Sequence, residues 1–188
     1  MSAITFGYTE WRRWLADFWT TIRLIALVWS IYWRVSHPVD ELFWWMFFLA
    51  VAVAGVTDYL DGRSARLYGS NWWGVLYDSH VDKLCFIWFA FVILVDHPLG
   101  REPFEVICLA VMAVREVGMG IGRAFGGPGL FPVQTVGKIK MVVQFVALAL
   151  YGVPLPFVWP IARVALFVAT ILTLFSLGKY LYDWSRRS

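Results

Sequence analysis

The chain has 188 residues, of which 60% are hydrophobic, 19% aromatic and only 15% charged. This composition is too apolar for an ordinary soluble domain, and the length suits one domain over residues 1–188. The net charge is +3, but the basic residues form no face separate from the apolar segments, which argues against nucleic acid as a partner. Cys85 and Cys108 each lie inside an apolar run, so we expect small core residues rather than a disulfide or a zinc site.

Apolar windows of the length that a membrane requires follow one another along the chain. Residues 1–18 come first, and Trp11, Leu15 and Phe18 recur there at i, i+4 and i+7, which is typical of an amphipathic juxtamembrane helix lying in the interface. Spanning segments of about 20 apolar residues are then expected at 19–35, 42–60, 74–95, 104–122, 136–152 and 157–178. The sequence therefore predicts an all-α integral membrane fold with six transmembrane helices and an N-terminal interfacial amphipathic helix.

The basic residues are distributed unevenly over the connections between these segments. The side with both termini would hold Arg12, Arg13, Arg63, Arg66, Arg123, Lys179, Arg186 and Arg187. The opposite side would hold Arg34, Arg101 and Arg163. The positive-inside rule then predicts a multi-pass protein of the cell or inner membrane with its termini on the cytoplasmic side. A basic chain of this kind also contacts anionic membrane lipids.

An acidic stretch lies between the second and third predicted spans. Asp58 and Asp61 are three residues apart, and Asp78 and Asp82 are four apart, so each pair shares one helix face. A short connection makes the two helices antiparallel neighbours, and the four carboxylates can converge at the cytoplasmic edge of the membrane. Four like charges repel one another, and an all-oxygen ligand set suits two Mg²⁺ or Mn²⁺ ions.

Plainer interpretations of this stretch stay open. The carboxylates could form a purely structural network with Arg63, Arg66 and Lys83. Gly62, Ala65 and Gly74 could serve helix packing instead of leaving space for a ligand. His80 lies between Asp78 and Asp82 on another face and is expected to be a neighbour and not a ligand.

The spacing Asp-x2-Asp-Gly-x2-Ala-Arg-x7-Gly-x3-Asp-x3-Asp over residues 58–82 resembles the signature of the CDP-alcohol phosphotransferase (phosphatidyltransferase) family. That family consists of membrane enzymes with six helices that join a CDP-linked donor to an alcohol. The gap of seven residues before Gly74 is shorter than the usual eight or nine. The family also carries Asn-x2-Thr-x2-Arg in its first helix, where this chain has Asp17, Thr20 and Arg23.

The resemblance implies a role for each matching residue. Asp58, Asp61, Asp78 and Asp82 would hold the two metal ions, with Asp82 also acting as general base. Thr20, Gly62, Ala65, Arg66 and Gly74 would bind the CDP group. The family resemblance further implies a homodimer.

The second half of the chain resembles the phosphatidylglycerophosphate synthases of that family. Matching residues are Arg115, Glu116, Arg123, Gly137, Lys138, Lys140 and Gln144, whereas Met141 replaces a threonine. Arg115, Arg123, Lys138 and Lys140 would bind the phosphate of an anionic acceptor. The plainer interpretation is that Arg115 pairs with Glu116 and that the two lysines mark a helix start at the headgroups. Gly118 and Gly122 indicate helix packing, including a possible dimer contact.

These observations favour a phospholipid synthase that transfers a phosphatidyl group from CDP-diacylglycerol to glycerol 3-phosphate and releases CMP. The same chemistry on inositol phosphate, serine or phosphatidylglycerol is the nearest alternative. A cation-binding membrane transporter is a rival from another class, but the aspartates gather at one end of their helices, and no helix is broken at mid-span. A non-catalytic scaffold that binds a CDP-lipid is a third possibility.

Overall fold

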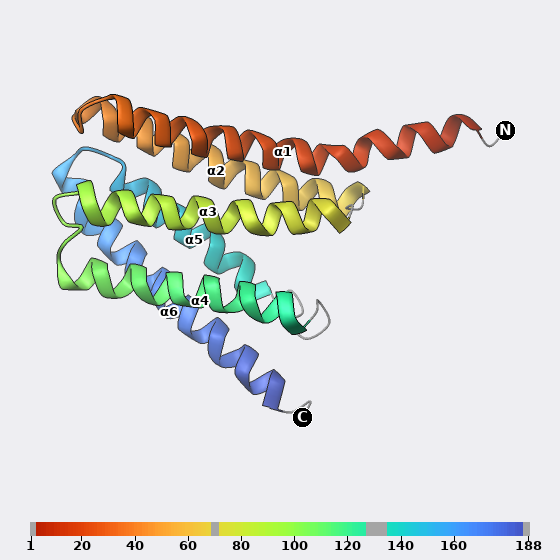
Figure 1. Ribbon diagram of the computed structural model, residues 1–188. Helices are drawn as coiled ribbons and strands as arrows, with labels where there is room; N and C mark the ends of the chain where they lie inside the picture. The colour runs from red at the N-terminus through yellow and green to blue at the C-terminus, as the bar shows by residue number, and fades with distance from the viewer. Residues whose placement is uncertain (1–2, 69–71, 127–134, 186–188) are drawn as a thin grey trace. The chain divides into compact units, whose positions relative to one another are not determined.

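The computed structural model describes residues 3–68, 72–126 and 135–185 (Figure 1). These residues form α-helices, one short 3₁₀ turn and the connections between them, with no strand, which confirms the all-α prediction. The elements are α1 (Ala3–Ser36), α2 (Glu41–Tyr68), α3 (Trp72–Asp96), α4 (Pro103–Gly126), α5 (Thr135–Tyr151), η1 (Pro156–Val158) and α6 (Trp159–Ser185).

Local chemistry explains where the helices begin and end. The Asp40 carboxylate accepts a hydrogen bond of 2.8 Å from the backbone N–H of Phe43 and so caps the start of α2. The turn after α3 requires glycine at position 100, because a Cβ there would overlap the backbone carbonyl of Ile93. Pro103 begins α4 at a position where its missing N–H costs nothing.

The N-terminal segment differs from its expected form. Residues 1–18 were expected to form a helix separate from the first span, but α1 runs without a break from Ala3 to Ser36. No proline occurs in this stretch, and its one glycine, Gly7, lies near the start, so nothing in the sequence ends the helix before the span begins.

The chain divides into two compact units, residues 1–88 and 89–188. In the first unit α1 packs along α2 (Figure 1), and the N-terminal part of α3 contributes buried side chains and polar contacts to α1. Phe43, Phe47 and Ala54 of α2 are buried there together with Val81 and Cys85 of α3. The core also contains a polar link, since the indole N–H of Trp88 donates to Ser30 of α1 at 3.0 Å.

In the second unit α6 packs against α5 and α4. Glu105 of α4 is fully buried and accepts hydrogen bonds from the Tyr151 hydroxyl of α5 at 2.9 Å and from Nε of Arg163 of α6 at 2.6 Å. The three helices are therefore joined by a buried polar contact near one end of the unit. Cys108 is buried and free, as is Cys85 in the first unit, which confirms the expectation for both cysteines.

In α6 the polar side chains are buried and the apolar side chains are exposed, which is the reverse of the pattern in a soluble protein. Its polar residues Thr173 and Ser176 are fully buried, whereas Val164 and Phe175 are 64% and 62% exposed. An exposed apolar surface of this kind suits lipid and not water. This pattern supports the predicted membrane character.

Two stretches of the described residues are long and apolar enough to cross a membrane. They are Glu41–Leu67 and Pro156–Tyr182, with mean hydropathy 1.6 and 2.0. The other long helices are interrupted by charged residues such as Arg23 in α1, Asp82 in α3 and Glu116 in α4.

Candidate active site

Three of the predicted carboxylates meet at one point in the first unit. Asp58 lies in the C-terminal half of α2, and Asp78 and Asp82 lie near the start of α3. One oxygen atom from each of the three lies within 4.8 Å of the others, and all three side chains are partly exposed. Oxygen ligands at this spacing suit Mg²⁺ or Mn²⁺, and the group contains no sulfur or imidazole ligand that would favour zinc.

Asp61 lies beside this group without belonging to it. Its Oδ2 atom accepts a hydrogen bond of 3.0 Å from the hydroxyl of Thr20, and both residues are buried. Thr20 and Asp61, predicted as a CDP-binding residue and a metal ligand, therefore contact each other across α1 and α2.

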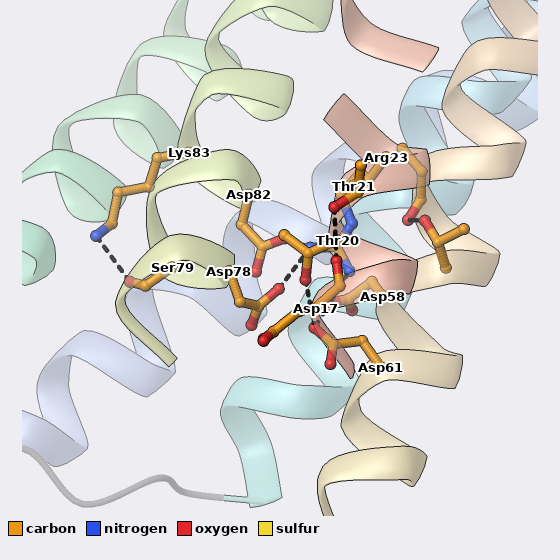
Figure 2. A network of polar contacts seen from close by, with 12 residues as sticks. Asp17, Thr20, Thr21, Arg23, Asp58, Asp61, Asp78, Ser79, Asp82 and Lys83 are labelled. Carbon is orange, nitrogen blue, oxygen red and sulfur yellow. Dashed lines mark hydrogen bonds and ion pairs between the residues drawn. The ribbon is translucent and has the colours of Figure 1, made fainter. Parts of the chain in front are cut away.

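Arg23 lies in the centre of the four aspartates (Figure 2). Its Nη1 atom donates to Asp78 Oδ1 at 2.8 Å and contacts Asp82 Oδ1. Its Nη2 atom lies 3.5 Å from Asp58 Oδ1 and 3.9 Å from Asp61 Oδ2. The side chain is 0% exposed, so it is a buried counter-charge for the whole cluster.

The sequence interpretation missed this role, although a signal was present. Thr20 and Arg23 are three residues apart on α1 and thus share one helix face. Thr20 was expected near the nucleotide, so the same face brings Arg23 to the site.

The structural network considered from the sequence takes a different form. That alternative would use Arg63, Arg66 and Lys83. The two arginines are exposed, and Lys83 donates to Ser79 at 3.1 Å. Arg23 of α1, which the alternative did not include, is paired with the aspartates. His80 is exposed and lies outside the three-carboxylate group, as expected.

A pocket of about 480 Å³ opens between α1 and α3 of the first unit. It is lined by Asp17, Gly74 and Tyr77 among others, and Trp14 and Phe18 give it aromatic walls. Partial burial, and to a smaller extent the Asp78 carboxylate, raise the pKa of Asp17 above its ordinary value. Gly74 is buried against Asp17, because a Cβ at position 74 would overlap the Asp17 carboxylate.

The other predicted CDP-binding residues lie further along α2. Gly62 and Ala65 are half-buried and Arg66 is exposed. A Cβ at Gly62 would lie 3.7 Å from Nη1 of Arg66, which is ordinary contact. The close packing expected of this stripe is thus present at Gly74 but not at Gly62.

A second polar cluster lies in the other unit and contains two of the predicted acceptor-binding residues. Glu116 contacts both Nη1 of Arg115, at 3.0 Å, and Nζ of Lys140. Nη2 of Arg115 donates to Ser176 at 3.0 Å. The pairing of Arg115 with Glu116, which the plainer interpretation gave, is therefore present, and Lys140 is fully buried.

Other parts of the acceptor prediction lie at the edge of the structure. The side chains of Arg123 and Lys138, and the surroundings of Gly122, fall outside what the structure describes. Gln144 is buried, and its Oε1 atom has no hydrogen-bond partner among the described residues. Gly118 is exposed and faces open space, where it lines a groove of about 630 Å³ between α4 and α6. It does not pack against another helix of the described chain.

Comparison with known proteins shows which family the chain resembles over most of its length. A family model described as CDP-alcohol phosphatidyltransferase matches residues 13–175. The chain is 34% identical over 140 residues to a CDP-diacylglycerol–glycerol-3-phosphate 3-phosphatidyltransferase from Escherichia coli (strain K12), which covers 71% of this chain and 75% of the relative. It is 33% identical over 164 residues to a probable phosphatidylglycerophosphate synthase from Mycobacterium tuberculosis (strain H37Rv), which covers 84% and 75%. No solved structure matches.

Proposed function

We propose that this chain, which belongs to the CDP-alcohol phosphatidyltransferase family, transfers a phosphatidyl group from CDP-diacylglycerol to glycerol 3-phosphate and releases CMP. Both relatives named above are phosphatidyltransferases or synthases with this acceptor or product in their names. The observation that carries the proposal is the convergence of Asp58, Asp78 and Asp82 from two helices.

The cluster fits the divalent ions that such a transfer uses. Asp58, Asp61, Asp78 and Asp82 would hold two Mg²⁺ or Mn²⁺ ions, since their donor atoms are all carboxylate oxygens. Bound ions of this kind neutralise the diphosphate of the donor and stabilise the departing CMP. Four mutually repelling carboxylates and one buried guanidinium leave an excess of negative charge, which a cation would balance.

The chain's own residues position the two substrates. Thr20, Gly62, Ala65, Arg66 and Gly74 would bind the CDP group, and the pocket beside Gly74 offers aromatic walls to its base. Asp82 would accept the proton from the acceptor hydroxyl, whose oxygen forms a new bond to the β-phosphorus. The bond between that phosphorus and the bridging oxygen breaks, and CMP leaves with the electron pair.

The acceptor site is the second part of the proposal. Arg115 and Lys140 share the single carboxylate of Glu116, so the cluster keeps one excess positive charge. A phosphate monoester such as glycerol 3-phosphate would complement this charge, with Arg123 and Lys138 as further ligands. Because the Glu116 carboxylate pairs with both side chains, Arg115 and Lys140 can lie close together in spite of their like charges.

The proposed setting is a multi-pass membrane domain. The six helices would each span the bilayer, with both termini and the aspartate cluster on the cytoplasmic side, where both substrates are available. The working form would be a homodimer, and the open face at Gly118 is suited to a contact between copies.

A panel of acceptors tests the proposal. Purified protein is incubated with CDP-diacylglycerol and labelled glycerol 3-phosphate, inositol phosphate, serine or phosphatidylglycerol, each with Mg²⁺ or Mn²⁺. We expect lipid-soluble product only with glycerol 3-phosphate. Product with another acceptor and none with glycerol 3-phosphate would contradict the choice of acceptor. Ion flux into vesicles without CMP release would contradict the transferase itself.

A further inference from the structure

The position of Arg23 has a consequence for how ions enter the site. Its guanidinium contacts Asp78, Asp82 and Asp58, which are the same three residues whose oxygens lie close enough to hold an ion. In each of the three contacts the aspartate contributes its Oδ1 atom. The guanidinium therefore lies where a divalent ion would make its bonds (Figure 2).

A guanidinium and a divalent ion do not share such a site at low cost. Like charges a few ångströms apart repel strongly where water is excluded, and Arg23 is 0% exposed. Each carboxylate oxygen also has few lone pairs, and those directed at Nη1 are not available to a metal ion. Binding of an ion at Asp78 and Asp82 thus requires that Nη1 leave them.

Only part of the hydrogen-bonding capacity of the Arg23 guanidinium is used by the described residues. Its Nη2 and Nε atoms are buried and have no hydrogen-bond partner within the part of the chain that is described. Only Nη1 donates within hydrogen-bond distance. A guanidinium that served structure alone would use its planar fork for two parallel bonds to one carboxylate. The strain of unpaired donors makes release less costly than for a fully satisfied arginine.

We propose that Arg23 is a positioning residue that substitutes for the metal ions when they are absent and is displaced when they bind. Without metal, its charge holds Asp58, Asp78 and Asp82 together at the spacing that the ions require. With metal, those carboxylates exchange Arg23 for the ions. The inference rests on the proposed metal-dependent function and adds an exchange step to it.

Metal binding to purified protein without nucleotide tests the exchange. Free Mn²⁺ is measured by electron paramagnetic resonance for the wild type, Arg23→Gln and the control Arg63→Gln, which removes an exposed charge near the same aspartates. Loss of the competing hydrogen bonds should tighten Mn²⁺ binding by Arg23→Gln on the order of tenfold. Arg63→Gln should change it by no more than about twofold, because an exposed charge is screened.

Thermal stability supplies a second readout that a nearby charge alone would not move. In EDTA, Arg23→Gln should unfold at a lower temperature than the wild type, because its carboxylates repel one another without a counter-charge. Mn²⁺ should restore the variant by more than it stabilises the wild type. Should Arg23→Gln fail to fold in EDTA, Arg23→Lys replaces it, and its single ammonium group should give an intermediate gain in Mn²⁺ affinity.

The outcomes separate the inference from the proposed function. The exchange would be overturned if the wild type binds Mn²⁺ and releases CMP but the Mn²⁺ affinity of Arg23→Gln is unchanged or weaker. The proposed function would then stand. Absence of both Mn²⁺ binding and CMP release in every form would overturn the proposed function and with it the exchange.

Discussion

Arg23 is a buried cation that contacts all four aspartates of the candidate site. Asp78 and Asp82 both contact the same nitrogen of Arg23, so their carboxylates are held on one side of the guanidinium. A general base has to be free to accept a proton, so the proposed role of Asp82 requires the proposed displacement of Arg23. The roles of ligand, base and counter-charge are thus coupled within a few ångströms.

The role of Asp82 as general base leads to a direct prediction. Asp82→Asn keeps an oxygen that accepts from Arg23 but cannot take a proton, so turnover should fall on the order of 10³-fold, with CDP binding largely retained. Steady-state kinetics and nucleotide binding by calorimetry check the two parts. Asp96→Asn makes the same change at the other end of α3 and should leave turnover nearly unchanged. Unchanged turnover in Asp82→Asn would remove Asp82 from the mechanism.

Gly74 offers a test of the pocket beside the cluster. Gly74→Ala introduces a methyl group that overlaps the Asp17 carboxylate, so the side chain of Asp17 has to rotate. We expect a higher KM for CDP-diacylglycerol and a loss of stability of no more than about 1 kcal/mol, because the partly exposed Asp17 side chain can move at low cost. Gly178→Ala is the matched control, because its methyl group meets nothing within 4 Å.

The cause can be checked with a second substitution. Asp17→Ala combined with Gly74→Ala removes the overlap and should recover most of the lost stability, measured by thermal unfolding in detergent. Equal stability of Gly74→Ala and wild type would contradict the tight packing at this position.

At the residue scale the sequence predicted the carboxylates better than their partners. The spacing of Asp58, Asp78 and Asp82 determines which helix faces they occupy, and their convergence followed from it. The partner Arg23 lies 35 residues before Asp58 in another helix, and no local pattern specifies which cation fills the centre. Burial of Lys140 could not be predicted for the same reason, since it depends on Glu116 of a different helix.

At the scale of helices, boundaries were predictable where the sequence contains a breaker. Asp40, Gly100 and Pro103 end or begin helices as their chemistry requires. The division of α1 into an interfacial helix and a span was wrong, because amphipathic periodicity alone does not end a helix. Helix contacts in the second unit depend instead on buried polar residues such as Glu105, whose partners lie 46 and 58 residues away.

The contact made by Glu105 predicts a stability effect that is independent of catalysis. Glu105→Gln removes the charge that Arg163 and Tyr151 share and should lower the free energy of unfolding by about 1–3 kcal/mol. Glu102→Gln is the control, since Glu102 is exposed three residues earlier. Thermal unfolding in detergent measures both. Equal stability of the two variants would show that the buried contact does not hold α4, α5 and α6 together.

At the scale of the whole molecule, the exposed apolar faces support membrane character, and the distribution of basic residues is the basis of the proposed orientation. The sequence predicted membrane character from composition, and the reversed polarity of α6 agrees with it. The number of spans is harder to predict, because charged residues interrupt several helices and lower their hydropathy. Residues proposed for the site are among them, so the proposed chemistry and membrane insertion place opposing demands on the same positions.

The proposed orientation predicts which exposed positions are accessible from each side of the membrane. Arg63→Cys should react with a membrane-impermeant maleimide only in inverted vesicles, and Glu102→Cys only in intact cells. Both positions are exposed, and the native cysteines are buried, so background labelling should be low. Labelling of Arg63→Cys from outside the cell would reverse the proposed orientation.

The aspartate cluster is proposed to carry out metal-dependent phosphatidyl transfer to glycerol 3-phosphate. The most direct measurement follows CMP and labelled lipid together in detergent micelles that contain purified protein, CDP-diacylglycerol and labelled glycerol 3-phosphate. We expect the two products to form in equal amounts with Mg²⁺ or Mn²⁺, EDTA to stop both, and added metal to restore both. Equal product with and without EDTA, or CMP released without labelled lipid, would contradict this proposal.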